Sequence, residues 1–191
     1  MGRPSVRHLI VDAGLRVFLR GGFNASSVQD ITEEAGVPKG SFYNHFDSKE
    51  ALGAEIVDLY AEGGGRRDVL KDTSLPPLDR LRRYFDGLNR MYATSGFEEG
   101  CLLGNFSAEL ADSSPAIRGR LEATFQRWTS EMEAVIAEGQ RLGDVPKDTS
   151  AGELAAFLLD AYEGAILRAR VEKSSAPFER FSTLAFGKIL R

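Results

Sequence analysis

Apolar residues recur at intervals of three and four along almost the whole chain, which is the period of an amphipathic helix. The first stripe of this kind consists of Val6, Ile10, Ala13, Val17 and Phe18. No alternating two-residue pattern of useful length appears, and no turn dipeptide joins two β-branched runs, so strands are not predicted. The pattern therefore predicts an all-α protein of about nine helices.

Capping residues mark the limits of the first four predicted helices. Pro38 is expected at the first position of the third helix, where its missing N–H is harmless, and that helix is expected to end near Asp47. The other limits come from glycines that end helices and from serines that begin them. These residues are Gly21-Gly22, Ser27, Gly36 and Ser48.

The glycine run Gly63 to Gly65 leaves one question open. Glycine inside a helix costs about 1 kcal/mol per residue, so the fourth helix either ends here or contains a hinge. A phosphate-binding loop is disfavoured because no strand precedes the run. Beyond it, prolines and capping serines predict further helices, of which the last two span about 151–171 and 177–190.

The second and third predicted helices are joined by the segment EEAGVPKG, which has the layout of a helix-turn-helix. In that motif the second helix enters the DNA major groove. Phe42 and Phe46 are four residues apart and are expected to anchor this helix in the core. The opposite side carries Lys39, Gly40, Tyr43 and Asn44. The segment is therefore predicted to have one buried face and one face that meets DNA.

The chemistry of the displayed face suits DNA. Lys39 can donate to guanine or to a phosphate, Asn44 can pair with an adenine edge, and Tyr43 can contact a thymine methyl or a phosphate. His45 and Lys49 are expected on phosphates, and a helix N-terminus can bind a further phosphate. The predicted DNA-binding residues are Ser27, Lys39, Gly40, Ser41, Tyr43, Asn44, His45 and Lys49.

Residues 7 to 52 resemble the N-terminal domain of TetR-type transcriptional regulators. The matching parts are Ser26-Ser27, Ala35-Gly36-Val37, Tyr43-x-His45-Phe46 and Lys49, in the order and spacing of the family. The resemblance implies a homodimer, an operator with two-fold character and a C-terminal helical domain that binds an inducer. It assigns residues 1–50 to DNA binding and residues 51–191 to effector binding and dimerisation.

Aromatic residues in the C-terminal part suit a pocket for a small apolar or planar ligand, although plain core packing is the favoured interpretation of any single one of them. The candidates for an effector pocket are Phe85, Tyr92, Cys101, Phe106 and Trp128. The segment Gly100-Cys101-Leu102 resembles a branch of TetR-type repressors that includes sensors of electrophiles and reactive small acids. In that resemblance Cys101 is a sensing thiol, and the alternative is an inert buried cysteine.

The last two predicted helices carry apolar stripes that the resemblance assigns to a four-helix bundle between two subunits. The interface candidates are Leu154, Phe157, Leu158, Ala161, Ala165, Phe181 and Leu184. Small residues among them would let the helices approach closely. The alternative is that these stripes pack only within one subunit.

Composition narrows the classes of function. A net charge of −4 and a pI of about 5.3 argue against a general nucleic-acid coat protein, whereas residues 36 to 46 contain Lys39 and no acid. A single cysteine fits a reducing cytoplasm. No apolar run has the length and low charge of a signal peptide or a membrane span, so we expect a cytoplasmic protein without membrane contact.

An enzyme is the rival class. Two histidines and one cysteine do not build a typical zinc site, and neither a Gly-x-Ser-x-Gly elbow nor a dinucleotide loop is present. The leading hypothesis is therefore a ligand-responsive transcriptional regulator, a repressor that a small effector releases from operator DNA, with no metal and no cofactor. The alternative is a small helical ligand-binding enzyme without an identifiable catalytic motif.

Overall fold

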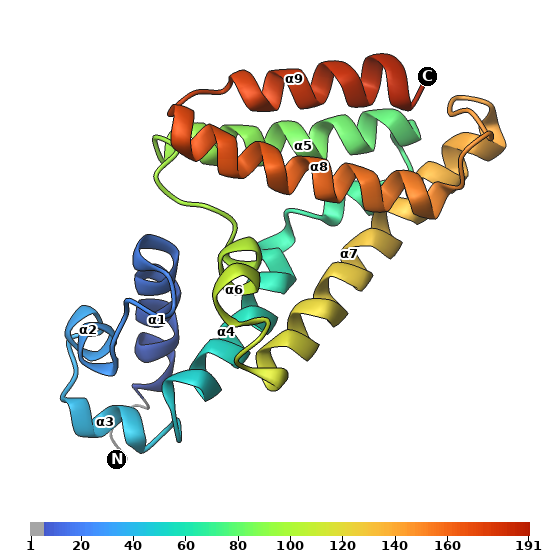
Figure 1. Ribbon diagram of the computed structural model, residues 1–191. Helices are drawn as coiled ribbons and strands as arrows, with labels where there is room; N and C mark the ends of the chain where they lie inside the picture. Colours follow the sequence, from blue (N-terminus) through green and yellow to red (C-terminus); the bar gives the residue numbers. More distant parts are fainter. Residues whose placement is uncertain (1–5) are drawn as a thin grey trace. The chain divides into compact units, whose positions relative to one another are not determined.

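The computed structural model describes residues 6–191, and this part of the chain is entirely helical (Figure 1). Within it the prediction of about nine helices is confirmed. The α-helices are α1 (Arg7–Gly21), α2 (Val28–Glu34), α3 (Lys39–Tyr43), α4 (Lys49–Glu62), α5 (Pro77–Thr94), α6 (Leu102–Leu110), α7 (Pro115–Leu142), α8 (Ala151–Glu172) and α9 (Ala176–Leu184). Short turns of other helix types are η1 (Gly63–Gly65), η2 (Asp68–Lys71) and η3 (Ala185–Ile189).

The described chain folds into two compact units. The first contains the residues up to Glu62 together with Cys101–Glu122, and the second contains Gly63–Gly100 and Ala123–Arg191. Helix α7 therefore begins in the first unit and continues in the second. These units are defined by how compactly the chain packs. The predicted boundary at residue 50, between DNA binding and effector binding, is a separate division and stays a prediction.

Aromatic packing holds the core of the first unit. Phe18 on α1 lies 5.3 Å from Phe23 and 5.4 Å from Phe106 on α6, measured between ring centroids. Phe18 and Phe106 have no exposed surface. Burying a phenylalanine side chain contributes roughly 1.5–3 kcal/mol, so this group ties α6 to the N-terminal helices despite the sequence distance. Gly22 ends α1 at a φ of 79°, as predicted for the glycine pair.

Helix α3 differs from its prediction at both ends. Pro38 is the N-cap, with an extended backbone at ψ 143°, so the helix begins one residue later, at Lys39. It ends at Tyr43 instead of near Asp47. In its last turn the Phe42 carbonyl accepts the N–H groups of both His45 at 2.9 Å and Phe46 at 3.0 Å.

The glycine run ends α4 and is not a hinge within it. Gly63 and Gly65 have φ values of 67° and 80°, in the left-handed region that favours glycine. The helix stops at Glu62, and a 3₁₀ turn follows. The question that the sequence left open is thereby settled for this segment.

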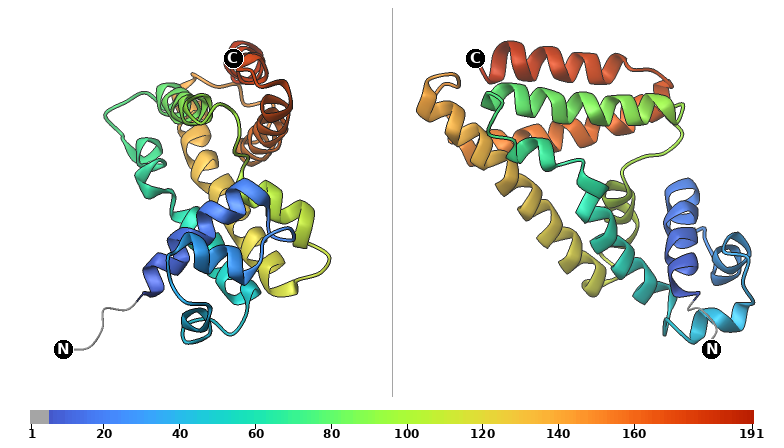
Figure 2. Two further views of the ribbon diagram at one scale, coloured as in Figure 1. Left: turned by 90° about the vertical axis from the view of Figure 1, so that its left-hand side faces the viewer. Right: turned by 180° about the vertical axis from the view of Figure 1, so that it is seen from behind.

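The second unit is built on α5, α8 and α9, which lie side by side (Figure 1 and Figure 2). Phe85 of α5 has no exposed surface and lies 4.9 Å from Tyr162 of α8 and 4.8 Å from Phe181 of α9. The Tyr162 hydroxyl donates to Asn89 Oδ1 at 2.7 Å, which satisfies a buried polar group. A capping box between Ser150 and Glu153 begins α8.

Candidate nucleic-acid interface

Helices α2 and α3 form the predicted helix-turn-helix. Ile31 of α2 and Phe42 of α3 are both fully buried and fix the two helices on the first unit. Gly36 lies between them with a φ of 66°, a backbone conformation that glycine adopts without steric cost. The turn therefore depends on the glycine that sequence analysis placed at the end of α2.

The two faces of α3 separate as predicted. Phe42 is 0% exposed and Phe46 is 5% exposed, whereas the neighbouring Tyr43 is 57% exposed. Lys39, Gly40 and Asn44 are exposed as well, while Ser41 and His45 are half-buried. A polar and aromatic surface is thus held on a helix whose other side is locked into the core.

Gly40 lies near the start of the exposed face of α3 and has no side chain to cover the backbone there. A Cβ atom added at Gly40 would meet nothing within 4 Å in the protein. Packing inside the chain therefore does not require glycine here. The missing side chain instead gives a partner molecule close access to the α3 backbone.

Ser27 acts as a helix cap. Its Oγ donates to Asp30 Oδ2 at 2.7 Å and accepts from the backbone N–H of Asp30 at 3.1 Å, which forms a capping box at the predicted helix start. The hydrogen bonds from Ser27 lower the pKa of the Asp30 carboxyl group below its usual value. A phosphate at this helix start would meet the Asp30 carboxylate, so we leave Ser27 out of the contact set proposed below.

Lys49 is engaged inside the protein. Its ammonium donates to the carbonyls of Phe23 at 2.8 Å and Ser26 at 2.6 Å, and it lies 4.2 Å from the centroid of the Phe23 ring. Burial lowers the pKa of Lys49, and the carboxylates of Glu109 and Asp30 oppose that shift. The geometry corrects the expectation of a phosphate contact, because the ammonium already binds the turn between α1 and α2.

Replacing Lys49 by Met is expected to destabilise the protein by about 1–2 kcal/mol, because two carbonyl groups lose their charged donor. Urea unfolding followed by circular dichroism measures this change. The salt dependence of DNA binding should keep its slope, since no phosphate contact is removed. If the affinity for DNA depended less steeply on salt while the stability stayed the same, Lys49 would instead be a phosphate contact.

Sequence reasoning missed Glu109 entirely. Its carboxylate accepts the backbone N–H groups of Phe23 at 3.1 Å and Asn24 at 2.6 Å. Glu109 lies near the end of α6, so this helix holds the chain just before α2. No sequence signal could have found the contact, because the partners are 85 and 86 positions apart and the acceptor is one acid among many.

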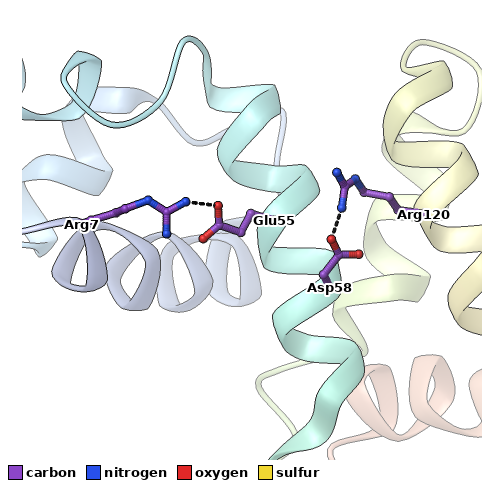
Figure 3. A network of polar contacts seen from close by, with 4 residues as sticks. All are labelled: Arg7, Glu55, Asp58 and Arg120. Atoms are coloured by element: carbon purple, nitrogen blue, oxygen red, sulfur yellow. Dashed lines mark hydrogen bonds and ion pairs between the residues drawn. The ribbon is translucent and has the colours of Figure 1, made fainter.

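Helix α4 is tied to its neighbours on two sides (Figure 3). Glu55 pairs with Arg7 of α1, and Asp58 pairs with Arg120 of α7. Exposed ion pairs of this kind contribute at most about 1 kcal/mol each. They show which sides of α4 face α1 and the beginning of α7.

The five candidates for an effector pocket are divided between the two units. Phe106 packs in the first unit, whereas Phe85 and Tyr92 belong to the aromatic core of the second. Trp128 packs edge-on against Phe125, with ring centroids 6.3 Å apart. All five are buried. Their burial fits core packing, the alternative that the sequence left open, and the assignment to a pocket stays a prediction.

Cys101 precedes α6 as its N-cap and is 4% exposed. Reactive cysteines lie in partly exposed, electropositive surroundings. The burial of Cys101 therefore favours an inert packing role in this conformation. Its role as a sensor stays a prediction that the structure does not support.

The interface candidates on α8 and α9 divide into two groups. Leu158 has no exposed surface and Leu154 is 6% exposed, so both pack within the chain. Phe157 and Leu184 are each 49% exposed. An apolar groove of about 300 Å³ is lined by five of the candidates together with neighbouring residues. These five are Phe157, Ala161, Ala165, Phe181 and Leu184.

Among residues 6–191, no three histidine, cysteine or acidic side chains are grouped so that they could hold a metal ion. In the same range, none of the helices combines the length and the apolar character needed to cross a bilayer.

Comparison with known proteins covers almost the whole chain. A family model described as "Bacterial regulatory proteins, tetR family" matches residues 10–56, and one described as "Tetracyclin repressor-like, C-terminal domain" matches residues 77–185. The first match contains α2 and α3, of which α3 carries the exposed face.

Curated relatives and solved structures agree with these matches. The "HTH-type transcriptional repressor DhaR" of Mycobacterium sp. (strain GP1) is 41% identical over 192 residues, which cover 100% of this chain and 95% of the relative. The "Transcriptional regulator AcuR" of Cereibacter sphaeroides is 32% identical over 181 residues, covering 94% and 82% of the two chains. The crystal structure of a regulatory protein TetR from Rhodobacter sphaeroides superposes with a TM-score of 0.90 at 31% identity, covering 96% of this chain and 98% of that one.

Proposed function

The chain belongs to the TetR family of bacterial transcriptional regulators, and from this premise we propose that it binds its operator DNA through the exposed face of α3. The observation that carries the proposal is the contrast between neighbouring residues, with Phe42 fully buried and Tyr43 57% exposed. A helix fixed by one side in the core and bearing donors on the other is what readout in the major groove requires.

We propose a contact set of six residues on or directly after α3. Lys39 and Asn44 supply base-edge or phosphate contacts, and Tyr43 supplies a hydroxyl together with apolar area for a thymine methyl. Gly40 supplies close backbone access. Ser41 and His45, both half-buried, complete the surface as phosphate donors. The acidic charge of the whole chain does not oppose this, because α3 itself carries no acid.

We propose that two copies of the chain associate through α8 and α9. The groove on this face is lined by apolar side chains, and large hydrophobic residues remain exposed beside it. The exposed residues are Phe157, Leu167, Val171 and Leu184. A second copy suits this surface because a two-fold axis brings the same apolar patch of each chain together. A dimer would also present two α3 helices to an operator with two-fold character.

We propose further that a small effector controls DNA binding and that the protein acts as a repressor in the cytoplasm. An effector that binds one arrangement of the two subunits more tightly shifts the population toward it. Release follows when the favoured arrangement no longer matches the spacing of the half-sites. The names of the relatives DhaR and AcuR, a repressor and a regulator, support this role. We propose no catalytic activity and no cofactor.

A mobility-shift assay with the DNA directly upstream of its own gene tests the proposal. At physiological salt we expect a discrete complex that survives an excess of unrelated competitor DNA, and a footprint with two-fold symmetry. A complex that unrelated DNA displaces equally well would indicate binding to phosphates alone. That result, or the absence of any complex, would contradict the proposed function.

A further inference from the structure

The second unit contains a pocket that the predicted functions have not used. It lies between η2, the beginning of α5 and the C-terminal half of α7 and has a volume of about 440 Å³. Sites for small molecules commonly have volumes of about 300–1,000 Å³. Leu70, Ala134 and Val135 provide an apolar wall, whereas Thr73 and Ser130 provide hydroxyl groups. The pocket is therefore large enough for a small organic molecule and offers it two kinds of surface.

Arg80 is the central polar group of this pocket. The residue is 3% exposed, its Nη1 donates to the carbonyl of Leu70 at 3.2 Å, and its Nη2 lies 2.5 Å from Glu138 Oε2. The Nε–H has no hydrogen-bond partner among the described residues. A buried donor without an acceptor costs about 1–3 kcal/mol, so such a group calls for an explanation.

The other charges of the pocket leave an excess of positive charge. Lys71 and Arg127 line it, are exposed and have no ion-pair partner among the described residues. Glu131 also lines it, but its carboxylate already pairs with Arg67 at 2.7 Å. Glu138 is likewise paired with Arg80. Lys71 and Arg127 therefore line the pocket without an ion-pair partner, and the Nε–H of Arg80 lines it without an acceptor.

We propose that this pocket binds a small molecule that carries a carboxylate group on an apolar body. The carboxylate accepts from the free Nε–H of Arg80 and is attracted by Lys71 and Arg127. The apolar body packs on Leu70 and Val135. The inference rests on the proposed function, because it gives the chemical class of the effector. It also places the effector site outside the aromatic residues that the sequence suggested.

Calorimetric titration of the full-length protein without DNA tests the inference directly. The probes are benzoate and hexanoate, with benzamide and hexanamide as neutral counterparts of the same shape and inorganic phosphate as an anion without an apolar part. We expect one carboxylate per chain, and at least about tenfold weaker binding of each amide, because the amide brings no charge to the arginines. Equal affinity of acid and amide, equal affinity of phosphate, or no binding of either acid would overturn the proposal.

Two variants distinguish binding in this pocket from a general attraction of anions to exposed arginines. Arg127→Gln removes an exposed cation of the pocket and should weaken benzoate binding about fivefold. Arg141→Gln removes an exposed arginine of the same helix that does not line the pocket and should leave the affinity unchanged. Equal effects of the two variants would count against the assignment.

The paired variant R80Q/E138Q tests the buried group without leaving one charge unpaired. Two amides can bond to each other in place of the ion pair, and we expect folding to be kept, as circular dichroism can verify. Benzoate binding should fall below detection. Full binding by this folded variant would overturn the role of Arg80.

Failure of this inference and failure of the proposed function give different results. The calorimetric experiment contains no DNA, and the mobility-shift assay contains no carboxylate. Operator binding without carboxylate binding would overturn only the effector class. Carboxylate binding that leaves the operator complex intact at saturation would overturn the assignment of this pocket to effector control.

Discussion

The double variant Lys39→Ala with Tyr43→Phe should lose specific operator binding while its unfolding curve stays that of the parent protein. Both side chains belong to the exposed face of α3, and Tyr43 is 57% exposed. Their removal therefore leaves the core untouched, and surface substitutions of this type change stability by about 0.5 kcal/mol or less. The variant separates DNA recognition from folding.

The size of the effect follows from the symmetry of the proposed complex. Each subunit loses one charged donor and one hydroxyl, and a dimer loses each contact twice. We expect the affinity for the operator to fall at least about 100-fold. Fluorescence anisotropy with a labelled operator fragment, at several salt concentrations, measures the loss.

A matched lysine provides the control for this variant. Lys147 is exposed and lies beyond the end of α7, in the second unit. Lys147→Ala removes the same charge from the chain and should leave operator binding unchanged. A comparable loss in Lys147→Ala would mean that net charge governs binding, and the assignment of the α3 face would then be wrong.

Phe85→Ala should destabilise the protein by about 3–5 kcal/mol, because a fully buried ring is replaced by a cavity. Phe85 touches rings from both α8 and α9, at 4.9 Å from Tyr162 and 4.8 Å from Phe181. Since domains are stable by only about 5–15 kcal/mol, the loss is a large share of the total. Urea unfolding measures it. Unchanged stability together with an altered effect of the effector on DNA binding would instead indicate that Phe85 lines a ligand pocket.

Phe157→Ala tests an exposed phenylalanine of α8, in contrast to the buried Phe85 of α5. Phe157 is 49% exposed, so truncation should cost the single chain less than about 1 kcal/mol. Dimerisation should weaken about tenfold if this face is the interface, as analytical ultracentrifugation can measure. Because association stabilises a dimer by mass action, unfolding should be compared at two protein concentrations. An unchanged dimer would exclude Phe157 from the interface.

Local signals in the sequence predicted much of the fold. The capping boxes at Ser27 and Ser150 and the glycine pair that ends α1 depend on residues within a few positions of one another. The burial of Phe42 and the exposure of its neighbour Tyr43 likewise follow from the helical period and the type of side chain. These features are readable because the physics that creates them is local.

Long-range contacts could not be read from the sequence. Lys49 lies next to a helix start, a position that suits a phosphate contact, yet it binds carbonyls 26 and 23 residues earlier. Glu109 and the pocket around Arg80 depend likewise on segments that meet only in the fold. The apolar period continues to Phe46 although α3 ends at Tyr43, so periodicity alone overestimates the length of this helix.

The packing of Trp128 gives the protein an internal optical probe. It is the only tryptophan in the sequence, it is 7% exposed, and the Arg67 guanidinium lies 5.2 Å from its ring. Arg67 also pairs with Glu131, a residue that lines the pocket beside Arg80. Indole emission responds to nearby charge, so an anion entering that pocket should change the emission of the unlabelled protein. Binding and its time course can then be followed by stopped-flow fluorescence without attaching a dye.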